Sequence, residues 1–492
     1  MATALKDFRI QLSDPGLFRE QCYVDGAWVD ADGRGAIEVD NPATGEVLGT
    51  VPKFGATETC RAIEVADRAF QSWKRTTAKE RARLLRKWFD LMMENQEDLA
   101  VLMTHEQGKP LAESRGEVAY GASFVEWYAE EAKRVYGDII PTVADNRRLM
   151  VIKQPVGVCA AITPWNFPNA MITRKCAPAL AAGCTVVVKP ASFTPYSALA
   201  LAELAERAGI PKGVFNVVTG GAREVGGELT SNDTVRKLSF TGSTEVGKIL
   251  LKQCADTVKK VSMELGGHAP LIIFDDADVD AAVKGAIACK FRNSGQTCVC
   301  TNRIYVQDSI YDDFAARFTE AVQKLKVGAG VESGTDQGPL IEPAAIDKVE
   351  RHVEDASSKG AKVLAGGKRH ARGGRFYEPT VLSECSKDML ISHEETFGPV
   401  GPLFRFKDED EVVRLANDTE YGLASYFFAR DVGRVFKVAE ELEAGIVSVN
   451  DGIFSTEVAP FGGYKHSGIG REGSKYGIDE YLEIKYVNLG GI

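Results

Sequence analysis

Two cysteines one residue apart, Cys298 and Cys300, end a run of small and polar residues in the segment FRNSGQTCVCT at 291–301. A cysteine nucleophile needs thiolate character, access to substrate, and hydrogen-bond donors for the oxyanion that forms when it attacks a carbonyl. A loop that contains glycine can bring its backbone close to a substrate. Buried free cysteines are also common, so this segment alone leaves a nucleophile and a packing residue as equal alternatives for Cys298.

Two other segments favour the nucleophile. TPWNFP at 163–168 follows a predicted strand, and α/β sheets bind ligands at the carboxyl ends of their strands. Asn166 lies there between two prolines and is a candidate amide donor, with an ordinary turn residue as the alternative. Glu264 in MELGG, 263–267, ends another predicted strand and is a candidate general base, with a structural salt bridge as the alternative.

Metal and disulfide chemistry have little support. The 10 cysteines are scattered without a CxxC pair and the 6 histidines do not cluster, so we predict no metal site and no disulfide framework. GIGREG at 468–473 matches a dinucleotide-binding glycine pattern, but no predicted strand precedes it. DADVD at 276–280 resembles a calcium loop, yet Ala281 and Ile287 replace the required glycine and glutamate, and a helix start explains its acidic residues better.

Strands and helices alternate from about residue 150 onward, after a long charged helical region nearer the N-terminus. A spacing of roughly 25–30 residues between apolar runs predicts βαβ units, and runs that are apolar throughout predict a parallel sheet covered on both faces. The strands of the first series are predicted at 158–163, 184–190, 213–220 and 237–242. A second series begins after 260–267, so we predict two α/β domains that join near residues 262–268.

The bulk properties restrict the function. The chain has 492 residues with 44% hydrophobic and 26% charged residues, which is typical of a globular protein of two or three domains. No apolar run is long enough to cross a membrane, no secretory signal is evident, and no basic run with aromatic residues indicates nucleic acid. We therefore expect a cytoplasmic enzyme, with a processed organellar form as the alternative. Because the net charge is −10, an anionic substrate would need locally placed arginines.

Seven segments in register resemble the aldehyde dehydrogenase superfamily over essentially the whole chain. They are FRNSGQTC, MELGG, TPWNFP, KPAS, FTGSTEVG, EETFGP and PFGGYKHSG. The resemblance implies an α/β fold with a Rossmann-type cofactor domain, an α/β catalytic domain and a small β oligomerisation element. The implied ranges are 1–135 and 153–266 for the cofactor domain, 267–466 for the catalytic domain, and 136–152 with 480–492 for a segment that bridges subunits of a homodimer or homotetramer.

The resemblance also implies a mechanism. Cys298 attacks an aldehyde, and the Asn166 amide and the Cys298 backbone N–H stabilise the oxyanion. Hydride transfer leaves a thioester, which water activated by Glu264 hydrolyses. Lys175 matches a lysine near the active site and is either structural or part of a proton path. The alternatives are an enzyme that passes the thioester to coenzyme A, against which Glu264 argues, and a catalytically silent binding or structural homologue.

The resemblance also implies the cofactor residues, among them FTGSTEVG at 240–247, which we predict to run from a strand into a helix whose N-terminus can meet a pyrophosphate. A tight strand–helix turn explains this segment equally well. Ser192 stands where many NAD-preferring members carry glutamate, so we expect NADP to be preferred and NAD accepted, with NAD preference as the alternative. The full set implied is Thr163, Pro164, Trp165, Lys189, Ser192, Gly242, Ser243, Gly247, Leu265, Glu395 and Phe397.

Two arginines indicate the substrate. Arg174 lies in ITRKC and Arg292 six residues before Cys298, and arginine binds carboxylates through two donors. The pair resembles that of the succinate-semialdehyde dehydrogenases within the superfamily, and Ser455 or Thr456 could add a hydroxyl. Glutarate semialdehyde is one methylene longer, a difference of ~1–3 kcal/mol in binding, so it stays an alternative, as do ordinary salt bridges for the arginines.

Cys300 has no catalytic role in this scheme. We hypothesise that it forms a reversible disulfide with Cys298 that inactivates the enzyme under oxidation, because so small a ring is strained and easily reduced. A passive neighbour is the alternative.

Overall fold

A largely parallel sheet of eight strands forms the centre of the first α/β domain in this computed structural model, which describes residues 10–491. Its order is β19-β11-β10-β7-β8-β9-β1-β2, with antiparallel pairs only at the two edges. The strands are β1 (Cys22–Val24), β2 (Ala27–Val29), β7 (Val158–Ile162), β8 (Thr185–Lys189), β9 (Phe215–Val217), β10 (Val235–Thr241), β11 (Lys260–Glu264) and β19 (Gly468–Ile469). The four strands predicted between residues 158 and 242 are confirmed.

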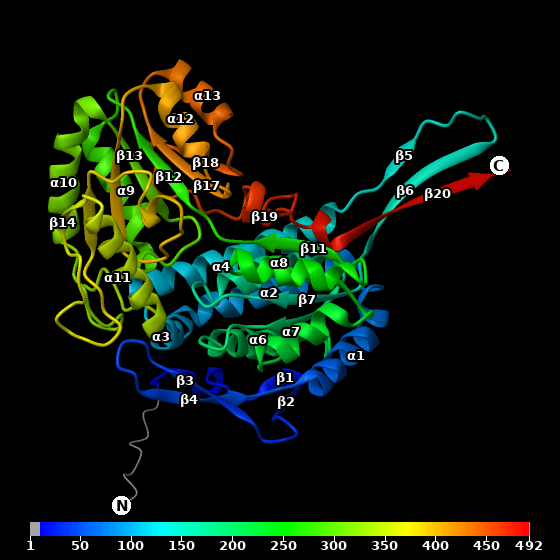
Figure 1. Cartoon of the computed structure of the whole chain (residues 1–492). Helices are drawn as coiled ribbons and strands as arrows, with labels where there is room; N and C mark the ends of the chain where they lie inside the picture. Colours follow the sequence, from blue (N-terminus) through cyan, green and yellow to red (C-terminus); the bar gives the residue numbers. More distant parts are fainter. Residues whose placement is uncertain (1–9, 492) are drawn as a thin grey trace, which may run out of the picture.

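Helices cover both faces of this sheet (Figure 1). Along β7, Val158 and Ala160 pack into a core shared with α1, α7 and α8, whereas Cys159 and Ala161 pack into a core shared with α2 to α6. Both faces are therefore buried, which explains why the strands are apolar throughout. The helices are α1 (Ala56–Trp73), α2 (Ala78–Glu94), α3 (Gln96–Gln107), α4 (Leu111–Glu131), α5 (Ala170–Ala182), α6 (Tyr196–Ala208), α7 (Ala222–Ser231) and α8 (Thr244–Ala255).

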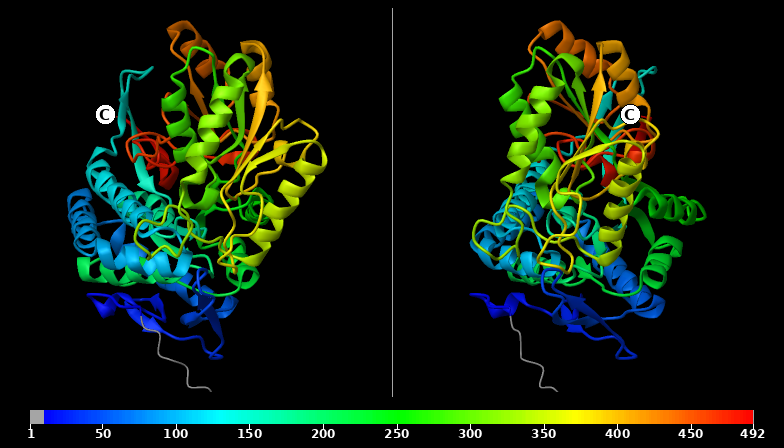
Figure 2. Two further views of the ribbon diagram at one scale, coloured as in Figure 1. Left: turned by 90° about the vertical axis from the view of Figure 1, so that its left-hand side faces the viewer. Right: turned by 60° about the vertical axis from the view of Figure 1, so that its left-hand side comes forward.

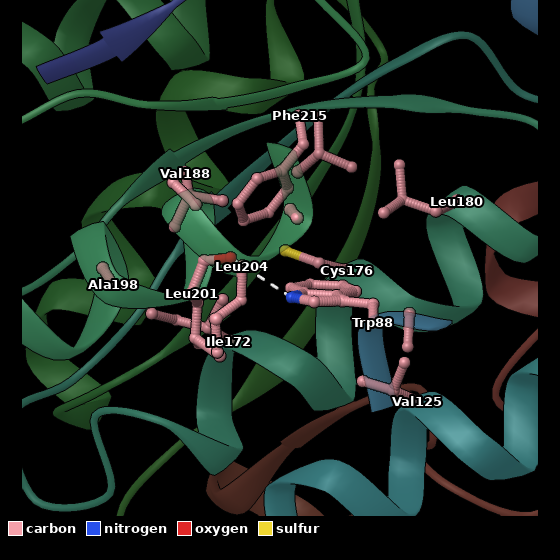
Figure 3. Packing of buried hydrophobic residues seen from close by; sticks show 14 of the residues in the cluster. Trp88, Val125, Ile172, Cys176, Leu180, Val188, Ala198, Leu201, Leu204 and Phe215 are labelled. Atoms are coloured by element: carbon pink, nitrogen blue, oxygen red, sulfur yellow. Dashed lines mark hydrogen bonds between the residues drawn. The ribbon is translucent and has the colours of Figure 1, made fainter. Parts of the chain in front are cut away.

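Trp88 of α2 is central to the larger of these cores (Figure 3). Its indole ring is fully buried 5.4 Å from the ring of Phe215, and its Nε1 donates to the Leu201 carbonyl at 3.2 Å. A large aromatic side chain with its polar atom satisfied contributes strongly to a core. Ile172 and Cys176 of α5 lie in the same cluster, so this packing also fixes the helix that carries Arg174 and Lys175.

The second α/β domain is built on a seven-stranded sheet of order β14-β15-β16-β13-β12-β17-β18, parallel except for the pair β14–β15. Its strands are β12 (Ala269–Ile273), β13 (Thr301–Gln307), β14 (Lys362–Ala365), β15 (Thr380–Ser383), β16 (Val400–Phe406), β17 (Ala424–Phe428) and β18 (Ile446–Val449). Its helices are α9 (Val279–Phe291), α10 (Tyr311–Gln323), α11 (Pro343–Ser358), α12 (Glu409–Asn417) and α13 (Val432–Glu441).

The two sequence segments that resembled ligand loops have other roles. Asp278 caps α9 by accepting a hydrogen bond from the Ala281 N–H at 3.1 Å, which confirms the helix start in DADVD. Among residues 10–491 no group of side chains could hold a metal ion. GIGREG contains β19, which pairs with β11 beside Glu264 and does not lead into a helix. The chain thus crosses between the domains twice, once after β11 and once before β19.

A three-stranded arm projects from the body of the molecule (Figures 1 and 2). It consists of β5 (Asp138–Ile140), β6 (Arg147–Pro155) and β20 (Leu482–Gly490), in the order β20-β6-β5. The predicted C-terminal strand is therefore present and pairs with β6 of its own chain, which continues past the expected limit at residue 152. Residues 1–9 and 492 of the expected ranges lie outside the described residues.

Two details complete the fold. A small two-stranded sheet of β3 (Ala36–Asp40) and β4 (Val47–Pro52) lies near the N-terminal end of the described chain, beside the first domain (Figure 1). Within residues 10–491, no helix combines the length and the apolar character needed to cross a membrane.

Candidate active site

The loop that carries Cys298 is held in an unusual backbone conformation. After α9, Asn293 and Ser294 have φ values of 50° and 58°, a left-handed region that costs non-glycine residues of order 1–3 kcal/mol each. Side chains hold the turn: Asn293 Nδ2 donates to the Asn166 carbonyl at 3.0 Å, and Ser294 Oγ to the Gly338 carbonyl at 2.9 Å. The small polar residues before Cys298 therefore build a rigid loop.

Cys298 lines a cavity of about 400 Å³ together with residues of both domains. Of the residues expected from the sequence, the cavity wall includes Pro164, Trp165, Asn166, Arg174, Gly242, Ser243, Leu265, Arg292, Cys298, Glu395, Phe397 and Ser455. The remaining expected residues, which are Thr163, Lys175, Lys189, Ser192, Gly247, Glu264, Cys300 and Thr456, do not line it. The cavity thus brings together residues predicted for each of the three roles, cofactor binding, catalysis and substrate binding, but not the whole predicted set.

Asn166 is held from both ends. Its side-chain Nδ2 donates to the Gln296 carbonyl at 3.0 Å, and its backbone carbonyl accepts from Lys109 Nζ at 2.6 Å. An amide nitrogen has two N–H donors. One N–H of Asn166 is thus anchored to the Cys298 loop, and the second can donate to an oxyanion in the cavity.

Cys298 is a thiol at rest. Burial raises the pKa of Cys298 to about 12, and the nearby carboxylates of Glu264 and Glu395 add to this effect. Because the thiolate is the nucleophile, a base must take the proton when Cys298 attacks.

Glu264 has the environment of such a base. It ends β11 and is buried, and neither carboxylate oxygen has a hydrogen-bond partner within the described chain. Burial, together with the charge of Glu472, raises the pKa of Glu264 to about 8, which suits general base catalysis near neutral pH. Gly267 lets this segment reach the nucleophile loop, since a Cβ there would lie 2.2 Å from the Cys298 carbonyl oxygen. No ion pair of Glu264 occurs within residues 10–491, so the structure does not support the salt-bridge alternative.

Glu472 joins two consecutive residues of α5. Lys175 Nζ forms an ion pair with Glu472 Oε1 and donates to Thr241 Oγ1 at 2.6 Å, and Arg174 Nη2 lies 2.7 Å from Glu472 Oε2. All three charged side chains are buried. Burial opposes ionisation of Glu472, but Lys175 and Arg174 outweigh it and lower the pKa of Glu472. Lys175 therefore lies behind the cavity wall, in an ion pair beside the candidate base.

Arg174 reaches the cavity despite this partner. Burial alone would lower the pKa of Arg174, and Glu472 reverses this so that the pKa is raised. The ion pair is close but poorly directed, because Nε and Nη2 of Arg174 have no hydrogen-bond partner in the described part of the chain. Two buried, unsatisfied donors at a cavity wall fit an anionic ligand.

Arg292 forms the second cationic position of the wall. Its guanidinium lies 5.0 Å from the ring of Phe167, and no ion pair of Arg292 occurs within residues 10–491. Ser455 also lines the cavity, whereas Thr456 Oγ1 contacts Glu457 at 3.3 Å outside it. Of the two hydroxyls considered, only that of Ser455 belongs to a residue of the cavity wall.

The N-terminus of α8 faces the other side of the cavity. Ser243 is its N-cap and accepts from the Val246 N–H at 3.4 Å, and both Gly242 and Ser243 line the cavity. A helix N-terminus favours phosphate groups. Gly247 has a packing role, because a Cβ there would lie 2.4 Å from Cδ2 of Leu265. The close approach expected for Gly247 is thus to the protein's own Leu265.

Two aromatic rings and a carboxylate form a slot next to Cys298. Phe397 meets Trp165 edge to face, with ring centroids 5.6 Å apart, and has a left-handed φ of 54°. Glu395 Oε1 accepts from the Gly267 N–H at 3.0 Å, and burial raises the pKa of Glu395 to about 7. An apolar slot beside a carboxylate fits the nicotinamide ring and ribose of a dinucleotide.

Lys189 ends β8 and Ser192 follows three residues later, and neither lines the cavity described above. Lys189 is buried, its Nζ donates to the Pro190 carbonyl at 3.2 Å, and burial lowers its pKa to about 8. Within residues 10–491 it forms no ion pair. Thr163 ties the ends of two adjacent strands together by donating its N–H to the Lys189 carbonyl at 3.1 Å. A buried lysine without a carboxylate partner fits a phosphate or ribose ligand.

Comparison with known proteins then identifies the family. The model of the aldehyde dehydrogenase family matches residues 28–487. This chain belongs to the aldehyde dehydrogenase family. Its curated relatives include the glutarate-semialdehyde dehydrogenase of Pseudomonas aeruginosa, 67% identical over 98% of this chain and 100% of the relative. The NADP-linked succinate-semialdehyde dehydrogenase GabD of Escherichia coli is 64% identical over 98% of this chain and 100% of that protein.

Solved structures of other aldehyde dehydrogenases share the fold. The structure of an Escherichia coli NADP-dependent enzyme has a TM-score of 0.97 and 64% identity over 98% of this chain and 100% of that chain. The betaine aldehyde dehydrogenase of Staphylococcus aureus in complex with NAD+ has a TM-score of 0.94 and 38% identity over 96% and 95% of the two chains. The expected family and fold class are therefore confirmed.

Cys300 of this aldehyde dehydrogenase does not line the cavity. It is buried, accepts from Thr297 Oγ1 at 2.7 Å, and lies 3.4 Å from the Lys290 carbonyl. Burial raises the pKa of Cys300, although Lys290 opposes this effect. A disulfide with Cys298 would require Cys300 to leave both contacts, so the redox pair stays a prediction.

Sequence reasoning missed several residues that contact the site of this family member. Glu472 belongs to GIGREG, where the glycine pattern drew attention from the glutamate. Lys109 and Glu117 form a buried ion pair behind Asn166, and Lys348 lines the cavity. Lys109 follows a glycine at a helix end, a pattern that indicates a turn but gives no sign that the lysine is buried.

Proposed function

We propose that this aldehyde dehydrogenase oxidises succinate semialdehyde to succinate, with NADP+ preferred and NAD+ accepted. One observation carries the proposal: a single cavity is lined by Cys298, by the cationic pair Arg174 and Arg292, and by the candidate cofactor residues Ser243 and Glu395. The nucleophile thus shares one cavity with groups that fit a carboxylate and groups that fit a dinucleotide.

In the first step, Cys298 Sγ attacks the aldehyde carbon and its proton passes to Glu264. The carbonyl oxygen becomes an oxyanion that accepts hydrogen bonds from Asn166 Nδ2 and from the Cys298 N–H. One such donor contributes about 3–4 kcal/mol to the transition state. The resulting thiohemiacetal stays anchored at its other end by Arg174 and Arg292.

A nicotinamide cofactor held beside Glu395 and Phe397 would supply the acceptor for the hydride of the thiohemiacetal carbon, which would leave Cys298 as a thioester. Once Glu264 has passed on the first proton, it takes a proton from the water that attacks the thioester carbon. The carbon–sulfur bond then breaks, and Cys298 leaves as a thiolate that regains a proton. Glu472 and Lys175 lie next to Glu264, so we assign to them the path by which the proton leaves the buried base. The alternative that passes the thioester to coenzyme A needs no such base.

The length of the substrate is the finer part of the proposal. The relatives named for glutarate semialdehyde are 67% and 66% identical to this chain, and GabD is 64% identical, so the identities do not separate the two substrates. One methylene changes binding by ~1–3 kcal/mol. We propose succinate semialdehyde as the first substrate and glutarate semialdehyde as the second.

Cofactor preference rests on the end of β8. Lys189 there has no carboxylate partner, and Ser192 can donate to a 2′-phosphate, which supports NADP+. GabD is named for NADP+, whereas the Staphylococcus aureus relative was solved with NAD+, so both cofactors occur in the family.

The arm supports a proposed homodimer or homotetramer. Its surface exposes Ile139, Ile484 and Tyr486 at 80%, 72% and 59%, and large apolar side chains in such numbers on a thin sheet favour a protein partner. The cytoplasmic location remains a prediction, since relatives in plants and mouse are named as mitochondrial.

The substrate proposal is tested by rates of NADPH and NADH formation with succinate semialdehyde and with butanal, which has the same carbon chain and no carboxylate. We expect the wild type to prefer the carboxylated aldehyde and Arg292→Ala to lose that preference. The matched control is Arg223→Ala, because Arg223 is exposed on α7. Equal turnover of butanal by the wild type would leave the family intact and refute the substrate.

A further inference from the structure

Lys109 is a fully buried cation that the mechanism above does not use. It lies in the turn between α3 and α4, and its Nζ is 2.5 Å from Glu117 Oε2, with both side chains 1% exposed. Burial lowers the pKa of Lys109, and Glu117 opposes this effect. A buried ion pair is a poor source of stability compared with apolar packing, so its contacts must explain its presence.

Those contacts lead directly to the oxyanion donor. Lys109 Nζ also donates to the backbone carbonyl of Asn166 at 2.6 Å. On its other side, Glu117 Oε1 accepts from the N–H groups of Asn169 and Ala170 at 2.9 and 3.2 Å, where α5 begins. The ion pair therefore holds the segment of residues 166–170 from both ends.

A ring of hydrogen bonds joins the same turn to the nucleophile loop. The Lys109 N–H donates to Gln107 Oε1 at 2.9 Å, and Gln107 Nε2 donates to Asn293 Oδ1 at 3.0 Å. Asn293 Nδ2 closes the ring by donating to the Asn166 carbonyl at 3.0 Å. The turn at residues 107–109 thus contacts the two segments that supply the oxyanion donors, Asn166 and the loop before Cys298.

We propose that Lys109 and Glu117 are positioning residues that fix the Asn166 amide in the geometry needed to stabilise the oxyanion. The proposal rests on the role given to Asn166 under the proposed function. Neither residue lines the cavity, so each would act only through the placement of Asn166. We call the Lys109–Glu117 ion pair and its contacts to residues 166–170 the brace. Because a displacement of about 1 Å can cost 100-fold in rate, loss of the brace would reduce activity while leaving the fold in place.

The test is a double-mutant cycle between Lys109→Met/Glu117→Gln and Asn166→Ala, since paired removal of both charges leaves no buried ion alone. We measure kcat/KM with succinate semialdehyde and the rate at which iodoacetamide alkylates Cys298, a reaction that forms no oxyanion. We expect kcat/KM to fall at least about tenfold and alkylation to stay within about twofold. When the paired substitution is added to Asn166→Ala, kcat/KM should fall by less than about a further twofold, because both sets of changes remove the same interaction with the oxyanion.

The control is Lys237→Met, which removes another fully buried lysine whose partner Glu480 keeps 29% exposure and whose contacts lie away from the cavity. Its kcat/KM should match the wild type. If the double variant fails to fold, Gln107→Leu breaks the same ring without touching a charge and should show the same non-additivity.

Three results would overturn the brace. The first is a loss of kcat/KM in the paired variant that adds fully to the loss caused by Asn166→Ala. The second is a rate of Cys298 alkylation that falls in parallel with kcat/KM, which would mean that the pair supports the Cys298 loop as a whole. The third is wild-type activity in the paired variant while Asn166→Ala is impaired. If Asn166→Ala itself retains full activity, the proposed role of Asn166 fails first, and the brace fails with it.

Discussion

The ionisation of Glu264 predicts how thioester hydrolysis depends on pH. Burial and the neighbouring Glu472 raise its pKa from 4.5 to about 8, and the base acts only when deprotonated. Hydrolysis should therefore rise about tenfold per pH unit below pH 8 and level off above it. At pH 7, one unit below the pKa, about one tenth of the plateau rate is expected.

Glu472→Gln perturbs this value in a known direction. The change removes the negative charge that raises the pKa of Glu264 and leaves Arg174 and Lys175, whose charges lower it. A single nearby charge shifts a carboxyl pKa by about 1–3 units. We expect the pH at which the hydrolysis rate reaches half of its plateau to fall by about one unit in this variant. Hydrolysis at pH 7 should then reach about half of the variant's own plateau.

The assay follows NADPH absorbance through a rapid burst and the slower steady phase between pH 6 and 9.5. The steady phase reports hydrolysis, and the burst reports the attack by Cys298. Because the pKa of Cys298 is raised to about 12 and Glu264 accepts its proton, the burst rate should also rise with pH up to the pKa of Glu264 and should shift in the same direction in Glu472→Gln. Glu94→Gln, which removes an exposed carboxylate, is the control and should keep the wild-type profile. A steady rate independent of pH between 6 and 9, or a half-plateau pH that rises in Glu472→Gln, would refute the assignment of Glu264.

Three further predictions concern other residues. Ser192→Glu should lower the NADP+/NAD+ ratio of kcat/KM at least about tenfold, because a carboxylate repels a 2′-phosphate; an unchanged ratio would show that position 192 does not face the ribose. Glu264→Gln should raise Tm more at pH 9 than at pH 5, since a folded pKa above the ordinary 4.5 means that stability is lost as pH rises from 4.5 through about 8; equal shifts in Tm would contradict this. Cys300→Ser should abolish any peroxide inactivation that dithiothreitol reverses, and identical recovery in wild type and variant would exclude the disulfide.

The domain architecture could be predicted because its signals are local. The apolar runs that became β7, β8 and β10 lie within a few residues of their predicted limits, since a strand buried on both faces must be apolar at every position. The structure also brings Cys298 and Asn166 into the wall of one cavity, because segments at strand ends and in small polar loops lie where an α/β sheet binds its ligands.

The long-range contacts could not be predicted. Lys175 and Glu472 are 297 residues apart in sequence, and nothing in either local segment indicates the other. Lys109 illustrates the same limit, because its neighbours predict a turn and not the burial of a charge. Gly247 shows the same limit: a Cβ at this position would collide with Leu265, a contact that is set by how α8 packs on the sheet and that the local segment does not indicate.

The second crossing between the domains has a consequence for biosynthesis. Glu472, β19 and β20 all follow the catalytic domain in the chain, yet they return to Lys175, β11 and β6 of the first domain. A nascent chain can therefore fold the contiguous second domain before the first has received its edge strand. Because chains emerge N-terminal end first, Glu472, the carboxylate beside the proposed general base, is among the last parts made, and we expect partial chains released earlier to lack turnover.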